Sequence, residues 1–169
     1  MFRKYFIALP LMLLTSCAII QDYVPPTNVD TSKLLMTRNI DGPLLGTTTH
    51  IYKVAKFRGC RAGLEAKEDV RLITQTASNP LISEFNEEGV QVKSGEELSI
   101  KIFTIAGQYS NCPMFAKFTP EVGKDYELRL LGRVNINPHQ CKAELWSTKV
   151  GTNIIKQESF KDFDSCLPK

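Results

Sequence analysis

Apolar and polar residues along most of the chain alternate with the two-residue period of β-strands rather than the longer period of helices. Short apolar or alternating runs, separated by glycine, proline, asparagine and aspartate, recur from residue 33 to residue 160. They predict strands at 33–39, 48–57, 70–76, 98–106, 114–119, 126–133, 142–148 and 153–160. We expect turns at 41–43, 88–89, 94–96 and 151, where glycine or proline interrupts the pattern.

This density of short strands indicates an all-β domain. Eight strands in roughly 130 residues suit two packed sheets better than one open sheet. We therefore expect a two-sheet β-sandwich of about 7–8 strands, of the immunoglobulin or transthyretin type. A small closed β-barrel is the alternative. The glutamate-rich stretch 78–97 is expected to be the least ordered part, and 63–69 offers at most a short helix.

The most detailed prediction concerns the region from Cys112 to Leu145. In 126–130 three apolar side chains alternate with Glu127 and Arg129, which predicts one buried and one solvated face. Pro120 and Gly123 mark a turn, so 112–126 reads as a hairpin. Three inward-facing sets should meet in the core: Met114, Ala116 and Phe118; Tyr126, Leu128 and Leu130; Cys141, Ala143 and Leu145.

The N-terminus has the order of a secretory signal. Arg3 and Lys4 precede the short apolar run 5–14, which Pro10 interrupts and which is shorter than the roughly 20 residues of a membrane-spanning helix. The run ends in Leu14-Thr15-Ser16-Cys17, which resembles the lipobox of bacterial lipoproteins. The resemblance covers only about the first 17 residues.

The lipobox resemblance implies an address and an orientation. In that family the signal, here 1–16, is removed and the cysteine, here Cys17, becomes the acylated first residue; two or more acyl chains anchor a protein stably. A residue other than aspartate after the cysteine, here Ala18, favours the outer membrane. We therefore expect a lipid-anchored N-terminus and tether at 17–31 and a single domain at 32–169, periplasmic or surface-facing.

Charge argues against two classes of partner. Of the 21 Lys and Arg residues, Arg3 and Lys4 lie in the signal, so the mature chain nearly balances its 18 Asp and Glu residues. A surface close to neutral does not suit nucleic acid or a dedicated anionic-lipid patch.

Four cysteines remain after Cys17, and in an exported chain they indicate two disulfides. Cys112 and Cys141 share the parity of the inward residues around them, so we expect them to pair across the two sheets and Cys60 to pair with Cys166. This requires the strand after the hairpin to cross to the other sheet, because a flat meander would separate the thiols by two strand spacings. Pairing of Cys60 with Cys112 and of Cys141 with Cys166 remains the alternative.

The spacing Cys-x5-Phe-Thr-Pro-x2-Gly-x2-Tyr, here 112–126, followed by Cys141, is similar to a pattern in small uncharacterised β-rich bacterial lipoproteins. No activity follows from it.

The chain offers few groups for catalysis. His50 and His139 are far apart in sequence, and neither lies beside a nucleophile motif such as Gly-x-Ser-x-Gly. No Cys-x-x-Cys, zinc-knuckle spacing, phosphate-binding loop or calcium loop is present. We expect a non-enzymatic protein without cofactor or metal.

Two aromatic residues are candidates for a partner surface. Trp146 shares a face with Lys142 and Glu144, opposite the apolar positions of its strand, and Tyr109 lies in the loop 106–111. The favoured hypothesis is a membrane-anchored binding or structural module of the cell envelope whose protein partner is unknown. The alternative is an inhibitor of a secreted enzyme such as lysozyme, which would insert the loop 106–111 or the loop 135–140 into an active site.

Overall fold

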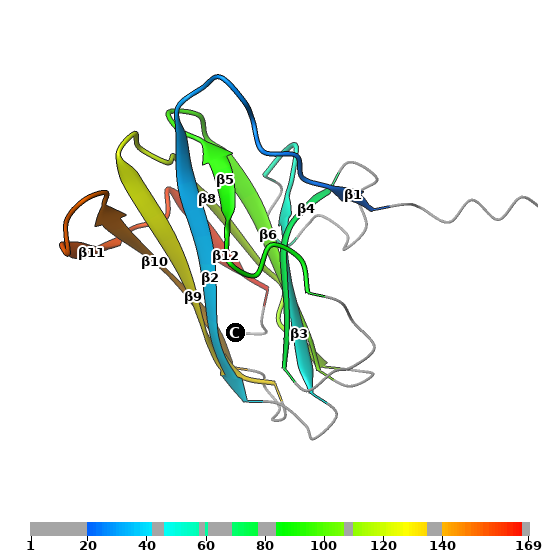
Figure 1. Ribbon diagram of the computed structural model, residues 1–169. Coiled ribbons are helices and arrows are strands. Elements are labelled where there is room, and N and C mark those ends of the chain that lie inside the picture. Colours follow the sequence, from blue (N-terminus) through cyan, green and yellow to red (C-terminus); the bar gives the residue numbers. More distant parts are fainter. Residues whose placement is uncertain are drawn as a thin grey trace, which may run out of the picture.

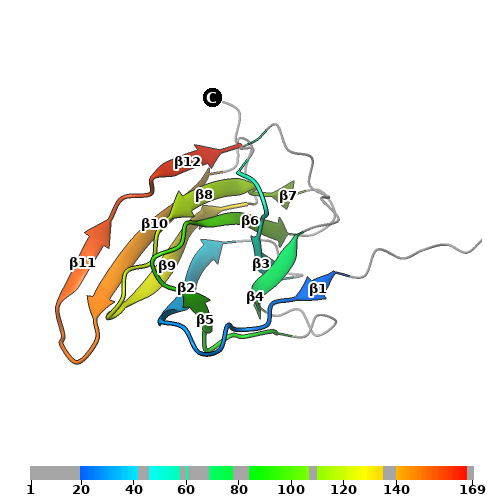
Figure 2. The ribbon, with the colours of Figure 1, turned by 90° about the horizontal axis from the view of Figure 1, so that it is seen from above.

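The computed structural model describes residues 20–41, 46–57, 60, 69–77, 84–106, 110–134 and 140–166. These residues form two sheets packed face to face and contain strands but no helix, so the expected β-sandwich is confirmed (Figures 1 and 2). Neither sheet closes on itself, so the alternative of a barrel is wrong. The strands are β1 (Gln21–Asp22), β2 (Thr31–Asp41), β3 (Thr47–Lys53), β4 (Val70–Ala77), β5 (Val90–Lys93), β6 (Leu98–Ala106), β7 (Ser110–Asn111), β8 (Met114–Phe118), β9 (Lys124–Arg133), β10 (Gln140–Lys149), β11 (Ile155–Glu158) and β12 (Asp162–Ser165).

The larger sheet has the order β1-β4-β3-β6-β8-β12, and the short β7 also pairs with β6. The smaller sheet has the order β11-β10-β9-β2-β5. Most neighbours are antiparallel, but β2 runs parallel to β9 and β1 runs parallel to β4. The chain therefore passes repeatedly from one sheet to the other, which is why contacts between residues distant in sequence dominate the fold.

The core lies between the sheets and contains the three inward-facing sets predicted from the sequence. Met114, Ala116 and Phe118 of the larger sheet meet Tyr126, Leu128, Leu130, Ala143 and Leu145 of the smaller one, with Cys141 packed against them. The β2 strand adds Leu34 and Met36 by the same alternation. Because each strand buries every second side chain, two moderately apolar sheets enclose a continuous apolar layer.

The segment between β8 and β9 is a crossing between sheets, which corrects the predicted hairpin. β8 pairs with β6 and β12, whereas β9 pairs with β2 and β10. Tyr126, the third residue of β9, accepts a hydrogen bond at its hydroxyl oxygen from the backbone N–H of Glu121, 3.0 Å away. This contact resembles the tyrosine corner that fixes sheet crossings in other sandwiches. The true hairpin partner of β9 is β10.

Several strand boundaries also differ from the sequence pattern. β5 lies within the stretch 78–97 that was expected to be poorly ordered, and it buries Val90 and Val92 against the core. β3 ends at Lys53, four residues earlier than expected. The last predicted strand, 153–160, corresponds to β11 alone, and β12 is an additional strand that belongs to the larger sheet. The count of about 7–8 strands is therefore too low.

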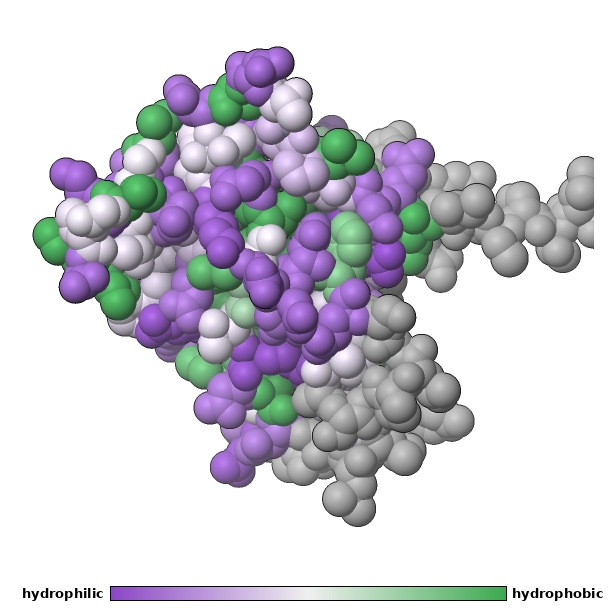
Figure 3. All heavy atoms as spheres, viewed as in Figure 1, coloured by the Kyte–Doolittle hydropathy of each residue, from purple (hydrophilic) through white to green (hydrophobic). Residues whose placement is uncertain are grey.

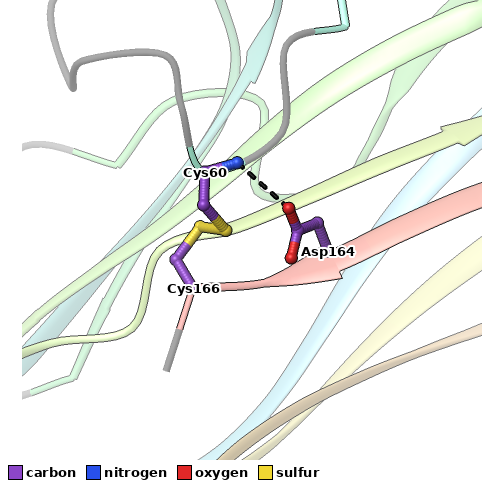
Figure 4. Close-up of a disulfide and its surroundings, with 3 residues drawn as sticks. All are labelled: Cys60, Asp164 and Cys166. Atoms are coloured by element: carbon purple, nitrogen blue, oxygen red, sulfur yellow. Dashed lines mark hydrogen bonds between the residues drawn. A yellow bond between two sulfur atoms is a disulfide. The ribbon is translucent and has the colours of Figure 1, made fainter. Parts of the chain in front are cut away.

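Both expected disulfides join cysteines that are close in space. The Cα atoms of Cys60 and Cys166 are 5.3 Å apart, and those of Cys112 and Cys141 are 6.0 Å apart. The second bridge connects the two sheets, as the parity of its cysteines predicted, but the crossing occurs before β9 and not after it. Figure 4 shows the first bridge, where the backbone N–H of Cys60 donates to the Asp164 carboxylate of β12 at 3.1 Å.

Part of the segment before β2, residues 21–23, is bound to the domain. β1 pairs with the edge of β4, and the carboxylate of Asp22 lies 2.6 Å from the Arg71 guanidinium. Tyr23 packs against the core, and its backbone N–H donates to the carbonyl of Arg71 at 2.9 Å. Residues 21–23, which the sequence pattern placed in a tether, thus lie against the sandwich.

Candidate functional site

The outer face of the smaller sheet carries an ordered set of polar side chains around Trp146. Because alternate residues of each strand face outward, the register of β2, β9 and β10 brings three outward-facing rows side by side. We name this set the Trp146 platform; it consists of Thr37 on β2, Glu127 and Arg129 on β9, and Lys142, Glu144 and Trp146 on β10.

The centre of the platform is a stack of Arg129 on Trp146. The Arg129 guanidinium lies 4.5 Å from the centroid of the Trp146 ring, within the range of a cation–π contact. The same guanidinium donates two hydrogen bonds to one oxygen of Glu127, at 2.7 and 2.9 Å. The other oxygen of Glu127 accepts a hydrogen bond from the Thr37 hydroxyl at 2.6 Å. Arg129 is therefore held from both sides.

A second carboxylate holds the indole. The Trp146 N–H donates to Glu144 at 3.1 Å, and Glu144 also forms an ion pair with Lys142. The Glu144 side chain is only 15% exposed, whereas that of Lys142 is 65% exposed. The indole is thus fixed by a hydrogen bond on its edge and by Arg129 on its face.

The charges of the platform favour recognition over acid–base chemistry. The hydrogen bonds from Arg129 lower the pKa of the Glu127 carboxyl, and the pKa of Glu144 is lowered mainly by its hydrogen bond from Lys142 and then by that from Trp146. Both groups are ionised at neutral pH and already paired. The arrangement presents a half-buried aromatic ring framed by two ionised carboxylates, one arginine and one lysine.

Trp146 lies where the alternation of β10 placed it, on the outward face with Lys142 and Glu144. The partners on β9 and β2 were not predicted. Glu127 and Arg129 were recognised as outward-facing, yet nothing local in the sequence indicates that β9 lies between β10 and β2. The only signal in the sequence is the spacing of Glu127 and Arg129. Because they are two residues apart, both face the same side of their strand, where the carboxylate can pair with the guanidinium.

Other candidates from the sequence lie outside the described residues. These are Cys17 in the lipobox, Tyr109 in the loop 106–111, and His139 in the loop 135–140. The inhibitor hypothesis depends on the same two loops and gains no support from the described part of the chain.

His50 is a half-buried member of β3. Its Nδ1 atom lies 2.9 Å from the hydroxyl of Thr74 on β4, and its ring centroid lies 5.8 Å from that of Tyr52. Burial lowers the pKa of His50, and the nearby positive charge of Arg71 lowers it further. Thr74 is only 1% exposed, so its hydroxyl is not presented to a substrate from solvent. The pair reads as a cross-strand hydrogen bond.

The outer face of the larger sheet holds a buried charge that the sequence did not reveal. Lys101 of β6 is 4% exposed, forms an ion pair with Asp69, and lies 4.9 Å from the Tyr52 ring centroid. A lysine at an outward-facing position of a strand is expected to be solvated. The burial of Lys101 is therefore seen only in the tertiary structure.

Among the described residues, no group of three or more histidine, cysteine, aspartate or glutamate side chains is placed to hold a metal ion. None of the described segments is a helix long and apolar enough to cross a membrane. Comparison with known proteins found no matching family model, no similar curated protein and no similar solved structure.

Proposed function

We propose that the protein is a non-enzymatic binding module of the bacterial cell envelope, anchored by lipid at Cys17 and contacting a protein partner through the Trp146 platform. The observation that carries the proposal is the fixed, half-buried indole between Arg129 and Glu144 on the outer face of the smaller sheet. Tryptophan and arginine are the side chains most enriched at binding hot spots, and a surface held rigid before binding loses less entropy on association.

The lipobox resemblance and the docked N-terminal segment support a defined orientation at the membrane. β1 pairs with the domain from Gln21 onward, and only Ala18 and Ile19 lie between Cys17 and Ile20, the first described residue. The three Cα-to-Cα steps from Cys17 to Ile20 span about 10 Å when extended. The β1 side of the sandwich would therefore stay close to the bilayer, and other faces would be directed toward the envelope.

The platform is tested by cross-linking intact cells that express the full-length protein and identifying what co-purifies with it. We expect one envelope protein to be captured by the native chain and largely lost with Trp146→Ala. Thr148→Ala, on the same strand and the same outward face, is the matched control and should retain capture. Equal capture by Trp146→Ala and the native chain would contradict a role for the platform.

The anchor is tested separately with Cys17→Ala. We expect this variant to move from the membrane fraction to the soluble fraction and to lose incorporation of labelled fatty acid, while Trp146→Ala keeps both. A Cys17→Ala chain that remains membrane-bound would contradict the lipid anchor and leave the platform untouched. If no partner is captured but the purified protein slows lysozyme, the inhibitor hypothesis replaces the proposed one.

A further inference from the structure

The smaller sheet ends in a strand whose outer edge is unpaired in the described part of the chain. β11 pairs with β10 alone, and three of its four residues are exposed. Figures 1 and 2 both show it as the outermost strand of its sheet, on the side opposite β1. An exposed edge strand presents backbone donors and acceptors that can pair with another strand.

Exposed aliphatic side chains lie at the start of β11 and near the turn that precedes it. Ile154 and Ile155 are 68% and 56% exposed, and Val150 in the turn before them is 59% exposed. Val122, which is 63% exposed, lies in the β8–β9 crossing, where the backbone N–H of Val150 donates to the Gly123 carbonyl at 2.9 Å. Figure 3 shows apolar side chains at the left margin of the molecule, where Figure 1 places β11. Clustered apolar exposure of this kind marks an interaction surface.

The charges on β11 are arranged to match a second copy of the same strand. Lys156 and Glu158 face one side, and Gln157 between them faces the other. If two β11 strands pair antiparallel about Gln157, Lys156 of each copy lies opposite Glu158 of the other. This register produces two opposite-charge pairs, each of the kind that stabilises neighbouring strands.

The same register brings apolar groups near one another. Ile154, just before β11, would lie at the end of the second copy's strand where its chain continues to Phe160, which stacks on Phe163 with ring centroids 5.3 Å apart. Phe163 is 41% exposed, so that stack has apolar surface to bury. Within one copy Lys156 already forms an ion pair with Glu158 at 3.2 Å, and Glu158 also pairs with Lys124 at 3.4 Å. The strand's own copy adds an opposite charge to each of these groups, whereas a strand with like charges at these positions would repel them, which is how charged edge strands resist indiscriminate pairing.

We propose that β11 is the seam of a symmetric homodimer, in which two copies pair antiparallel about Gln157 and join their smaller sheets into one continuous sheet. A two-fold axis through Gln157 makes the interface self-complementary, as closed dimers require. The contact uses a strand edge and not the Trp146 platform, so it does not depend on the proposed function. Attachment of both copies to one membrane would raise their effective concentration.

The first test is a cross-link at the two-fold axis in the full-length protein extracted in a non-ionic detergent. Directly opposed residues of antiparallel strands have Cα atoms about 4.5–5.5 Å apart, which is within the range for a disulfide. Gln157→Cys should form a covalent dimer under mild oxidation, seen on a non-reducing gel. Val24→Cys is the control, because Val24 is 82% exposed and follows β1, the strand that Figure 2 shows on the side of the sandwich opposite β11.

The second test reverses charges in the Gln157→Cys background. Lys156→Glu places like charges opposite each other twice and should reduce dimer yield at least about tenfold, and Glu158→Lys should do the same. A mixture of the two variants restores both opposite-charge pairs and should form a mixed dimer that neither variant forms alone. Because Glu158 also accepts a hydrogen bond from Ser147 at 2.8 Å, its variant is first checked for folding by circular dichroism.

Three outcomes would overturn the proposal. The first is equal cross-linking of the Gln157→Cys and Val24→Cys proteins. The second is an equal dimer yield from the Gln157→Cys protein with and without Lys156→Glu. This comparison is valid even if the Glu158→Lys protein does not fold. The third combines two results: the native protein sediments as a monomer in detergent at high concentration, and Ile154→Asp abolishes binding of the protein to vesicles of phosphatidylethanolamine and phosphatidylglycerol. These results together would assign the exposed aliphatic side chains to a membrane contact and not to a dimer.

Discussion

His50 shows how the position of one side chain between strands sets its titration. The ring is held against Thr74 and is half-buried, so the charged imidazolium is disfavoured in the folded protein and the pKa falls below its ordinary value of 6.5. The unfolded chain binds a proton at a higher pH than the folded chain does. Stability contributed by neutral His50 is therefore present above about pH 6.5 and is lost as the pH falls through that value toward the lower folded pKa.

We expect the free energy of unfolding to decrease between about pH 7.5 and pH 5, and part of that decrease to disappear in His50→Gln. The measurement is urea denaturation followed by circular dichroism across this pH range. His139→Gln provides the control for the other histidine. An identical pH profile for the native and His50→Gln proteins would contradict a lowered pKa.

Tyr126 shows how a single hydrogen bond can contribute to stability where the chain crosses from one sheet to the other. Its ring is 3% exposed and packs 5.4 Å from the Phe118 ring, while its hydroxyl accepts from the Glu121 backbone. Tyr126→Phe should keep the packing and remove the hydrogen bond, at a cost of about 1 kcal/mol in the free energy of unfolding. Tyr52→Phe is the control, since no hydrogen bond of the Tyr52 hydroxyl occurs within the described residues. Equal stability of the two variants would show that the crossing does not depend on this contact.

At the scale of elements, the pairing of β9 with β10 depends on a glycine inside a strand. Gly132 has a φ of 154°, and a Cβ built on it would lie 2.0 Å from the backbone oxygen of Gln140. This contact is with backbone and not with a flexible side chain, so the strands would have to separate. The position adjoins Cys141, whose disulfide joins the two sheets.

Gly132→Ala should therefore destabilise the protein by more than about 3 kcal/mol, because both the backbone conformation and the space exclude a methyl group. Gly95→Ala is the matched comparison: Gly95 has a φ of 75° but nothing lies within 4 Å of its added Cβ. Only the conformational cost applies there, at about 1 kcal/mol. Thermal and urea unfolding of both variants would check the difference, and similar costs would contradict the steric explanation.

At the scale of the whole molecule, two disulfides and the docked segment 21–23 link parts of the chain that are far apart in sequence. Cys60 and Cys166 are separated by 106 residues, and their bridge ties the end of β12 to the segment that precedes β4. The bridge between Cys112 and Cys141 spans 29 residues and joins the two sheets at one end of the core. Each restricts the unfolded chain, and the longer loop should restrict it more.

Replacing both Cys60 and Cys166 with alanine should lower the free energy of unfolding by about 4–5 kcal/mol, the chain-entropy value for a loop of about 100 residues. The far-ultraviolet circular dichroism spectrum should still report β-structure, because β8 continues to pair with both β6 and β12. Chemical denaturation of the double variant provides the measurement. A loss below about 1 kcal/mol would show that strand pairing alone holds the C-terminal end.

The sequence by itself determined eight of the twelve described strands and the faces of their side chains, because the two-residue alternation of a strand is local, whereas the short strands β1, β5, β7 and β12 were not predicted. That alternation placed Tyr126, Leu128 and Leu130 inside and Trp146 outside, and the parity of Cys112 and Cys141 indicated their pairing. The tertiary structure alone decided which strands are neighbours. Sheet partners are chosen by contacts across the whole chain, so no local pattern indicated that 119–123 crosses between sheets, that Arg129 would lie over Trp146, or that β11 would form an edge.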